Sequence, residues 1–203
     1  MKKKVVILIH GLCRSPYSFL MMKKFLEKHG YTVVLFSYNS IKYSIYKLAD
    51  KFTEFLYYTS DKFKLPLNIV SHSMGGILTR IALGNIDNKN SISIGRIVML
   101  APPNNGAKAA DKFLQYLPPS RILRPLKDLR TTSDSPIHQV YIPSNYEIGI
   151  IAGSLDAKVS VSESHLPTEK EHLIVNSAHT FIMNSTTVKK AVLTFLNTGT
   201  FKV

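Results

Sequence analysis

The stretch Ile69-Val70-Ser71-His72-Ser73-Met74-Gly75-Gly76 passes from an apolar run directly into a helical pattern, with Ser73 at the junction. A serine on such a strand-to-helix bend projects its hydroxyl above the edge of a sheet. The bend needs small residues two positions before and after the serine, and Ser71 and Gly75 meet this need, although a glycine is the usual residue at the first position. The positive end of the following helix favours negative charge there. The stretch therefore predicts a serine nucleophile.

Short apolar runs alternate with helical patterns along the rest of the chain. Apolar residues recur at helical spacing in segments 15–30, 41–56, 74–83 and 188–199. This alternation predicts an α/β fold, with about six mostly parallel strands and helices on both faces. In such sheets, reactive groups gather at the carboxyl edge. The predicted strands are nearly continuous in apolar and β-branched residues, as strands covered on both faces should be: Val5–Ile9, Thr32–Phe36, Leu67–Ser71, Arg96–Leu100, Glu147–Ala152 and His172–Val175.

The length of 203 residues predicts a single domain over 1–203. Segment 107–142 is longer and more broken than the other connections, because Pro118-Pro119, Pro125 and Pro136 interrupt any long helix. It is equally compatible with a small lid over a substrate pocket and with an ordinary helix followed by a surface loop.

His10-Gly11-Leu12 follows the first predicted strand. Gly11 permits a sharp turn at the carboxyl edge, after which the amide of Leu12 could face a bound carbonyl oxygen. Together with the amide of Met74 it would form an oxyanion hole. Alternatively, Gly11 serves only a tight turn and His10 packs internally. The neighbouring serine bend favours the oxyanion role.

A serine nucleophile needs a general base, and His179 has the best position among the seven histidines. It follows the last predicted strand and leaves the sheet at the same edge as the serine bend. His172 lies at the opposite end of that strand, roughly ten ångströms or more away at ~3.3 Å per residue. His29 sits near a helix end, and His72 is expected to point away from the bend.

The acid that orients the base is expected at Asp156, which follows the strand that ends in Ile151-Ala152-Gly153. The order Ser73, Asp156, His179 is the order of triad members in one known hydrolase architecture. Glu163 and Asp134 are the alternatives for this acid.

Lys and Arg outnumber Asp and Glu by 26 to 13, which gives a net charge of +13. The basic residues are scattered and no nucleic-acid-binding signature accompanies them, so we expect no specific nucleic-acid partner. Such a charge suits solubility and also a weak association with an anionic membrane surface. No apolar run approaches ~20 residues, and the run Val5–Ile9 is too short for a signal-peptide core. We expect a cytoplasmic protein.

Four motifs together carry a resemblance: His10-Gly11-Leu12, the serine bend, Leu100-Ala101-Pro102-Pro103-Asn104 and Ser177-Ala178-His179-Thr180-Phe181. With them the chain resembles small bacterial α/β-hydrolases, the compact lipase-like esterases with a minimal cap or none. The resemblance implies the α/β-hydrolase fold, a triad of Ser73, Asp156 and His179, oxyanion amides at Leu12 and Met74, no metal and no cofactor.

The expected activity is hydrolysis of small-molecule or lipid carboxylic esters with short to medium acyl chains, through an acyl-enzyme on Ser73. An acyltransferase or a thioesterase would use the same triad, and a non-catalytic binding module on the same fold is a further alternative. Residues expected near the substrate are His10, Gly11, Tyr17, Phe19 and His72. Leu20, Phe113, Leu114 and Leu117, together with Tyr17 and Phe19, would line an acyl pocket or belong to the core.

Overall fold

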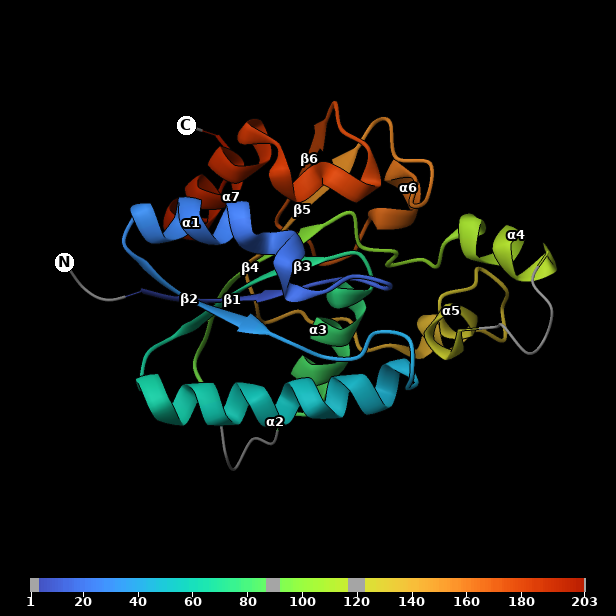
Figure 1. The fold of residues 1–203 in the computed structure, drawn as a ribbon, viewed down its shortest axis with the longest axis horizontal. Helices are drawn as coiled ribbons and strands as arrows, with labels where there is room; N and C mark the ends of the chain where they lie inside the picture. The colour runs from blue at the N-terminus through green and yellow to red at the C-terminus, as the bar shows by residue number, and fades with distance from the viewer. Residues whose placement is uncertain (1–3, 87–91, 117–122, 203) are drawn as a thin grey trace.

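A sheet of six parallel strands forms the centre of the computed structural model, which describes residues 4–86, 92–116 and 123–202 (Figure 1). The strand order is β2-β1-β3-β4-β5-β6. The prediction of an α/β fold with six strands is confirmed, with ends shifted by at most two residues. The strands are β1 (Lys4–Ile9), β2 (Tyr31–Phe36), β3 (Leu67–His72), β4 (Ile94–Leu100), β5 (Ile148–Gly153) and β6 (Glu171–Val175).

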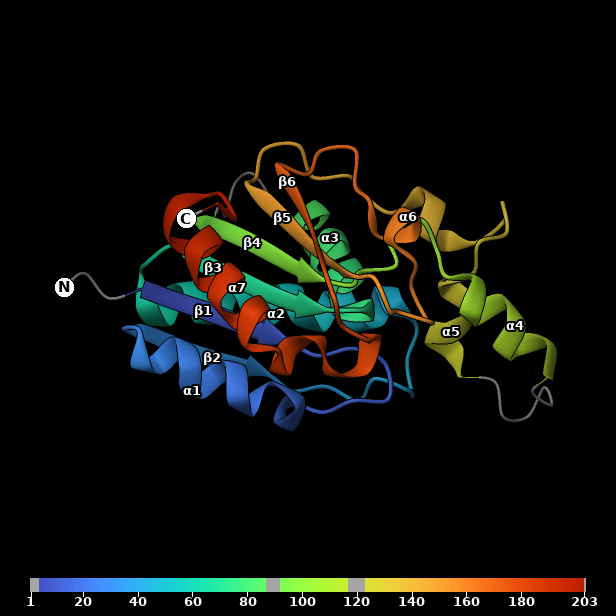
Figure 2. The same ribbon diagram turned by 90° about the horizontal axis from the view of Figure 1, so that it is seen from above.

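Four helices cover the two faces of the sheet. In both ribbon views α1 and α7 lie on one face, and α2 and α3 lie on the other (Figures 1 and 2). These helices are α1 (Leu20–Lys28), α2 (Ile45–Phe63), α3 (Met74–Gly84) and α7 (Thr186–Thr198), and α1 is preceded by the 3-10 helix η1 (Pro16–Phe19).

Helix ends follow local capping chemistry. The Ser44 side chain accepts a hydrogen bond from the Lys47 amide, so α2 begins at Ile45 and not at Ile41, where the apolar pattern starts. The Ser185 hydroxyl caps α7 in the same way, and Gly199 ends it in the left-handed conformation, at the predicted residue.

The strand β1 shows why the apolar runs are continuous. Val5, Ile7 and Ile9 pack toward α2 and α3, whereas Val6 and Leu8 pack toward α1 and α7. Successive side chains on a strand point to opposite faces, so a strand covered on both faces is apolar at every position.

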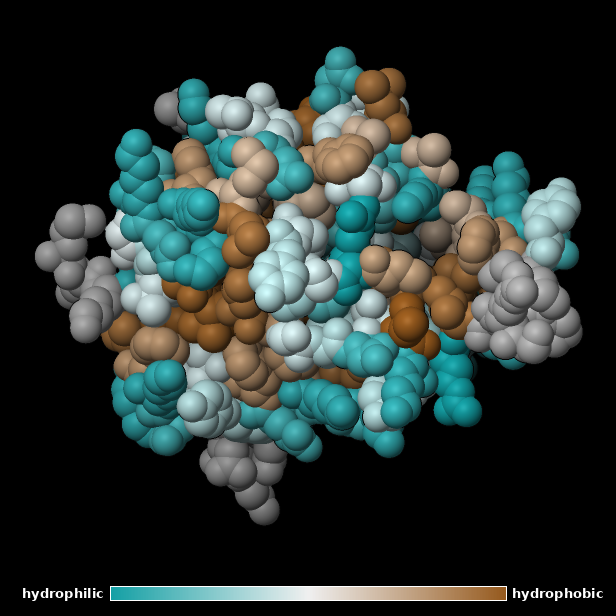
Figure 3. Space-filling view, viewed as in Figure 1, coloured by the Kyte–Doolittle hydropathy of each residue, from teal (hydrophilic) through white to brown (hydrophobic). Residues whose placement is uncertain are grey.

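The described parts of segment 107–142, which are residues 107–116 and 123–142, extend beyond the carboxyl edge of the sheet (Figures 1 and 2). Their elements are α4 (Lys108–Tyr116), α5 (Arg124–Asp128) and the 3-10 helix η4 (Pro136–Gln139). Pro125 and Pro136 lie in the first turns of α5 and η4, where a proline fits. Pro118-Pro119 lie outside the described residues. In the space-filling view, brown apolar surface gathers over this segment, whereas teal surface dominates over α2 (Figure 3).

One buried arginine ties this segment to the sheet layer. Arg80 on α3 donates hydrogen bonds to the carbonyl oxygens of Val140 (2.9 Å), Tyr141 (3.1 Å) and Asn104 (3.1 Å). The Asn104 side-chain amide in turn donates to the Ser164 carbonyl (2.8 Å). Because the side chain is buried, these bonds fix the end of segment 107–142 against α3 and the loop after β4.

The remaining elements are α6 (Val161–Ser164), between β5 and β6, and the 3-10 helix η5 (His179–Asn184), between β6 and α7. Of the helices within the described ranges, none combines the length and the apolar character that crossing a membrane requires.

Candidate active site

Ser73 occupies a strained bend between β3 and α3. Its backbone has φ 53° and ψ −127°, a conformation that costs a non-glycine residue about 1–3 kcal/mol. Hydrogen bonds on both sides hold the bend: the Ser73 amide donates to the Leu100 carbonyl (2.9 Å), and the Gly76 amide donates to the Ser73 carbonyl (2.8 Å). This backbone conformation places the serine hydroxyl above the carboxyl edge of the sheet.

Gly75 lets α3 approach the end of β1. A Cβ atom at this position would lie 2.8 Å from the carbonyl oxygens of both Ile9 and His10. Since backbone atoms cannot yield, any side chain here would push the helix away from the strand. The small residue that follows the serine by two positions therefore brings the loop after β1 against the serine bend.

Ser73, His179 and Asp156 form a continuous hydrogen-bonded chain. His179 Nε2 lies 3.0 Å from Ser73 Oγ, and His179 Nδ1 lies 2.6 Å from Asp156 Oδ2. The Asp156 side chain is fully buried, and that of His179 is 9% exposed. A proton on Nδ1, donated to the carboxylate, leaves the Nε2 lone pair facing the hydroxyl. This geometry suits proton removal from Ser73.

The carboxylate is held by its own loop. Asp156 Oδ1 accepts hydrogen bonds from the amides of Lys158 (2.8 Å) and Val159 (2.9 Å). These two bonds leave Oδ2 free for the imidazole. The loop amides therefore fix the orientation of the carboxylate toward His179.

The loops after β5 and β6 are tied together, which brings Asp156 to His179. The Ser154 amide donates to the Val175 carbonyl (2.8 Å). At Gly153 a Cβ atom would lie 2.3 Å from the Ser177 carbonyl oxygen. Only glycine fits this approach, so Gly153 is a sequence signal for the convergence of the two loops.

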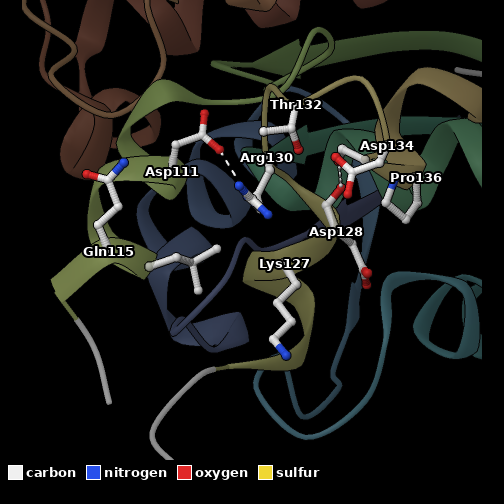
Figure 4. A pocket seen from close by; sticks show the side chains of 10 residues that line it. Asp111, Gln115, Lys127, Asp128, Arg130, Thr132, Asp134 and Pro136 are labelled. Atoms are coloured by element: carbon white, nitrogen blue, oxygen red, sulfur yellow. Dashed lines mark hydrogen bonds and ion pairs between the residues drawn. The ribbon is translucent and has the colours of Figure 1, made fainter. Parts of the chain in front are cut away.

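The alternative acids lie elsewhere. Glu163 accepts hydrogen bonds from the amides of Ser160 (2.7 Å) and Lys108 (2.8 Å), so both of its oxygens serve the start of α6 and of α4. Asp134 lines a polar cavity of about 470 Å³ in segment 107–142, in which Asp111 pairs with Arg130 (Figure 4). No residue of the Ser73–His179–Asp156 chain lines this cavity.

His72 lies beside His179, with ring centroids 4.9 Å apart, and forms part of the lining of the pocket at Ser73. Its ring is buried, and its Nε2 lies 3.0 Å from the His179 carbonyl oxygen, to which it can donate. Burial and the neighbouring His179 hold the pKa of His72 well below its usual value. The ring therefore stays neutral and supports the backbone of the His179 loop.

The loop after β1 runs against the nucleophile. A Cβ atom on Gly11 would lie 2.9 Å from Ser73 Cβ, so this backbone runs directly against the bend. Within the described part of the chain, the amides of Leu12 and Met74 donate no hydrogen bond, which leaves both free for a substrate oxygen. His10 is fully buried and stacks on Tyr38, with ring centroids 4.2 Å apart, so it does not reach the substrate.

A pocket of about 270 Å³ opens at Ser73 and His179. One wall is apolar and comes from segment 107–142. The rest comes from the loops after β1, β4, β5 and β6 and from the bend after β3. Its lining residues are Leu12, Cys13, Arg14, His72, Ser73, Pro103, Ala107, Ala109, Ala110, Phe113, Leu123, Leu126, Leu129, Lys158, Val159 and His179.

The expected acyl-binding residues need correction. Phe113 lines the pocket, but Phe19 is fully buried in the core that faces α1 and α7, because it packs under the first helix. Tyr17 and Leu20 are exposed and lie outside the pocket lining. Leu114 lines the polar cavity instead, and Leu117 lies outside the described residues.

One cluster, between α6 and β6 and outside the lining of the pocket at Ser73, has donor atoms suited to a metal. His165 Nδ1 and His172 Nδ1 lie 2.6 Å and 3.0 Å from Glu169 Oε1, and the two rings stack with centroids 4.0 Å apart. In this arrangement the three side chains satisfy one another by hydrogen bonds between α6 and β6.

The sequence does not indicate that Arg14 and Lys158 line the pocket that opens at Ser73. Each is one basic residue among 26, and neither belongs to a motif. The only available signal was topological: both follow strands that flank β3 and β4 at the carboxyl edge.

A family model described as alpha/beta hydrolase fold matches residues 4–141. Lysosomal thioesterase PPT2 of Mus musculus is 28% identical over 122 residues, which are 58% of this chain and 39% of the mouse protein. The chain thus spans about two fifths of that relative's length.

Two solved structures are similar to the whole fold. Bacillus licheniformis lipase BlEst2 in its mature form has a TM-score of 0.76 at 16% sequence identity, and the match covers 97% of this chain and 92% of the lipase chain. Phospholipase PlaB from Legionella pneumophila has a TM-score of 0.74 at 15% sequence identity, and the match covers 95% of this chain and 57% of the phospholipase chain. With the family match over residues 4–141, the chain belongs to the α/β-hydrolase fold family.

Proposed function

We propose that this hydrolase cleaves carboxylic esters with short to medium acyl chains, using Ser73 as the nucleophile. The observation that carries the proposal is the hydrogen-bonded chain from Ser73 through His179 to buried Asp156, at the mouth of an apolar pocket. A binding module would have no need for this chain of three groups or for the strain at Ser73.

In the first step His179 Nε2 takes the proton of the Ser73 hydroxyl as Oγ attacks the ester carbonyl. The carbonyl oxygen becomes an oxyanion, which the free amides of Leu12 and Met74 can bind. The imidazolium, stabilised by Asp156, then protonates the leaving alcohol, and the acyl group stays on Ser73.

In the second step His179 removes a proton from water, which attacks the acyl-enzyme carbonyl. The tetrahedral intermediate collapses, Oγ leaves and takes the proton back from His179, and the acid departs. The reaction consumes one water and yields one acid and one alcohol.

The pocket volume supports the proposed chain length. A space of about 270 Å³ lies just below the roughly 300–1,000 Å³ common for small-molecule sites. Its apolar wall, which includes Phe113, Leu123 and Leu126, suits an acyl chain. In this proposal the described residues 107–116 and 123–142 supply the wall that holds the acyl chain.

The first prediction tests the nucleophile. Ser73→Ala should lower kcat for p-nitrophenyl butyrate by a factor on the order of 10⁴–10⁶ and abolish labelling by a fluorophosphonate. Ser71→Ala is the matched control, because Ser71 is buried two residues away and its hydroxyl has no hydrogen-bond partner among the described residues. Full activity in the Ser73 variant would refute the proposal.

A thioesterase is the second candidate, since the mouse relative carries that name. The same residues would attack a thioester carbonyl, with a thiol leaving in place of an alcohol. Comparing kcat/KM for an ester and a thioester of the same acyl chain separates the two activities. Adding an alcohol acceptor and analysing the products distinguishes hydrolysis from acyl transfer.

A further inference from the structure

Two cationic side chains stand at the mouth of the pocket that holds the proposed nucleophile. Arg14 lies on the loop after β1, and Lys158 lies on the loop after β5, so they approach from strands on either side of β3 and β4. Arg14 is half-buried and Lys158 is exposed. The residues that line the pocket include no aspartate and no glutamate. The mouth of the pocket is therefore positively charged.

No group among the described residues forms an ion pair with either cation. Among the residues that the structure describes, the Arg14 guanidinium and the Lys158 ammonium take part in no ion pair and no hydrogen bond. Other cations, such as Arg96 and Lys170, do pair with a carboxylate. The carboxylate nearest in sequence to Lys158 is Asp156, whose two oxygens already serve His179 and the loop amides.

The charges of Arg14 and Lys158 also act on His72, which lies beside His179. Burial is the main reason for the lowered pKa of His72, and the positive charges of Arg14 and Lys158 lower it further. Both cations therefore lie close enough to act on groups beside Ser73. An anionic part of a bound ester would meet them there, while its acyl chain meets the apolar wall from segment 107–142.

We propose that the preferred substrates are acyl esters or thioesters whose leaving alcohol or thiol carries a phosphate, and that Arg14 and Lys158 bind this phosphate. The inference rests on the proposed function. Arginine offers a planar fork of donors that matches phosphate oxygens, and lysine adds a mobile point charge. In a pocket without acidic groups, two uncompensated cations favour a phosphate over a neutral polar group.

The same cations could act differently, by stabilising the oxyanion of every ester. In that case they would raise the rates for neutral and phosphate-bearing substrates alike. Substrate pairs that share the acyl chain and differ only in the phosphate-bearing part separate the two roles.

The experiment measures kcat/KM for two such pairs. The first pair is 1-octanoylglycerol and 1-octanoylglycerol 3-phosphate, and the second is the octanoyl thioester of N-acetylcysteamine and octanoyl-coenzyme A. We expect the phosphate-bearing member of at least one pair to react about tenfold faster or more, with a preference that shrinks as salt is raised. The pair that shows the preference identifies a lipid or a coenzyme A thioester as the source.

Three variants assign the preference to residues. Arg14→Gln and Lys158→Gln should each reduce the ratio of kcat/KM between pair members, and the double variant should bring it close to one. Lys112→Gln is the matched control, because Lys112 lies on α4 outside the pocket lining and its loss changes the net charge equally. Thermal melting of each variant checks that it is folded.

Equal kcat/KM for the two members of both pairs would overturn the inference. So would a double variant that keeps the wild-type ratio, or a Lys112→Gln variant that lowers the ratio as much as the Arg14 and Lys158 variants do. The inference would also fail if the variants lowered kcat/KM equally for both members of a pair. The last result would assign the cations to the oxyanion. Hydrolysis of the neutral members by the wild-type protein shows that the proposed function holds even if this inference fails. Absence of hydrolysis of every ester and thioester would contradict the proposed function itself.

Discussion

His72 supports the proposed base through the backbone. Its ring nitrogen lies 3.0 Å from the His179 carbonyl, at the point where the loop after β6 turns into η5. We expect His72→Leu to lower kcat for p-nitrophenyl butyrate about tenfold with little change in KM, because one lost hydrogen bond of roughly 1 kcal/mol loosens the base and not the pocket. Steady-state kinetics and the rate of fluorophosphonate labelling measure the effect.

Rescue by a conservative variant distinguishes positioning from bulk packing. His72→Gln places an amide donor near the former ring nitrogen and should recover most of the kcat. A loss that appears equally in the Gln and Leu variants, or mainly in KM, would contradict a positioning role for His72.

The residues brought together at the carboxyl edge were predictable for a topological reason. Ser73, Asp156 and His179 each follow a predicted strand, and parallel strands end at one edge, so their meeting follows from the strand pattern. The same reasoning does not say which side chains fill the space between them. Phe19 and Phe113 look alike in the sequence, yet one is core and the other lines the pocket.

Arg80 is expected to hold segment 107–142 in place. Burial lowers its pKa to about 10, so the guanidinium stays charged at neutral pH and keeps donating to the Val140, Tyr141 and Asn104 carbonyls. We predict that Arg80→Met lowers the free energy of unfolding by about 3 kcal/mol or more, because several buried acceptors lose their partner. Urea unfolding measures this loss.

A second arginine provides the control for this prediction. Arg96 on β4 pairs with half-exposed Glu147 (2.7 Å), and a pair of this kind contributes only about 0–1 kcal/mol. Arg96→Met should therefore cost much less. Hydrogen exchange should also show faster exchange in residues 136–142 for the Arg80 variant alone. Equal losses of unfolding free energy in the two variants would contradict the role of Arg80 in holding segment 107–142 in place.

At the level of elements, the sequence predicts the covered strands well and segment 107–142 poorly. In β1 the five consecutive residues from Val5 to Ile9 are apolar and buried because both faces of the strand are covered, so the sequence alone indicates their burial. In segment 107–142, Pro125 and Pro136 start short helical turns instead of ending them. The partner that fixes this segment is Arg80, which lies in another helix and leaves no local pattern.

Several histidines are buried in their neutral form, and their lowered pKa values determine how the stability of the whole molecule depends on pH. Burial lowers the pKa values of His10, His72 and His172 below 6.5 in the folded state. In the unfolded chain these groups titrate near 6.5. As pH falls below this value the unfolded state binds more protons than the folded state, so the free energy of unfolding decreases.

The fall begins near pH 7, where the unfolded histidines start to bind protons, and continues as the pH drops toward the lowered pKa values of the folded state. Its slope should reach up to about 1.4 kcal/mol per pH unit for each buried histidine. Carboxylates add to the fall at lower pH: hydrogen bonds from Lys170 and Arg96 lower the pKa of Glu147, and its contribution is lost only as pH falls below about 4.5.

Urea unfolding at a series of pH values tests this, with His72→Gln as the comparison. Removing one buried histidine should reduce the slope of the unfolding free energy against pH by up to about 1.4 kcal/mol per pH unit once the pH falls below about 6.5. If the wild-type free energy of unfolding stays constant or rises as the pH is lowered below about 6.5, the buried rings are not held neutral. The support that His72 gives to the His179 loop would then have to come from a charged imidazole, which the apolar surroundings of β3 make costly.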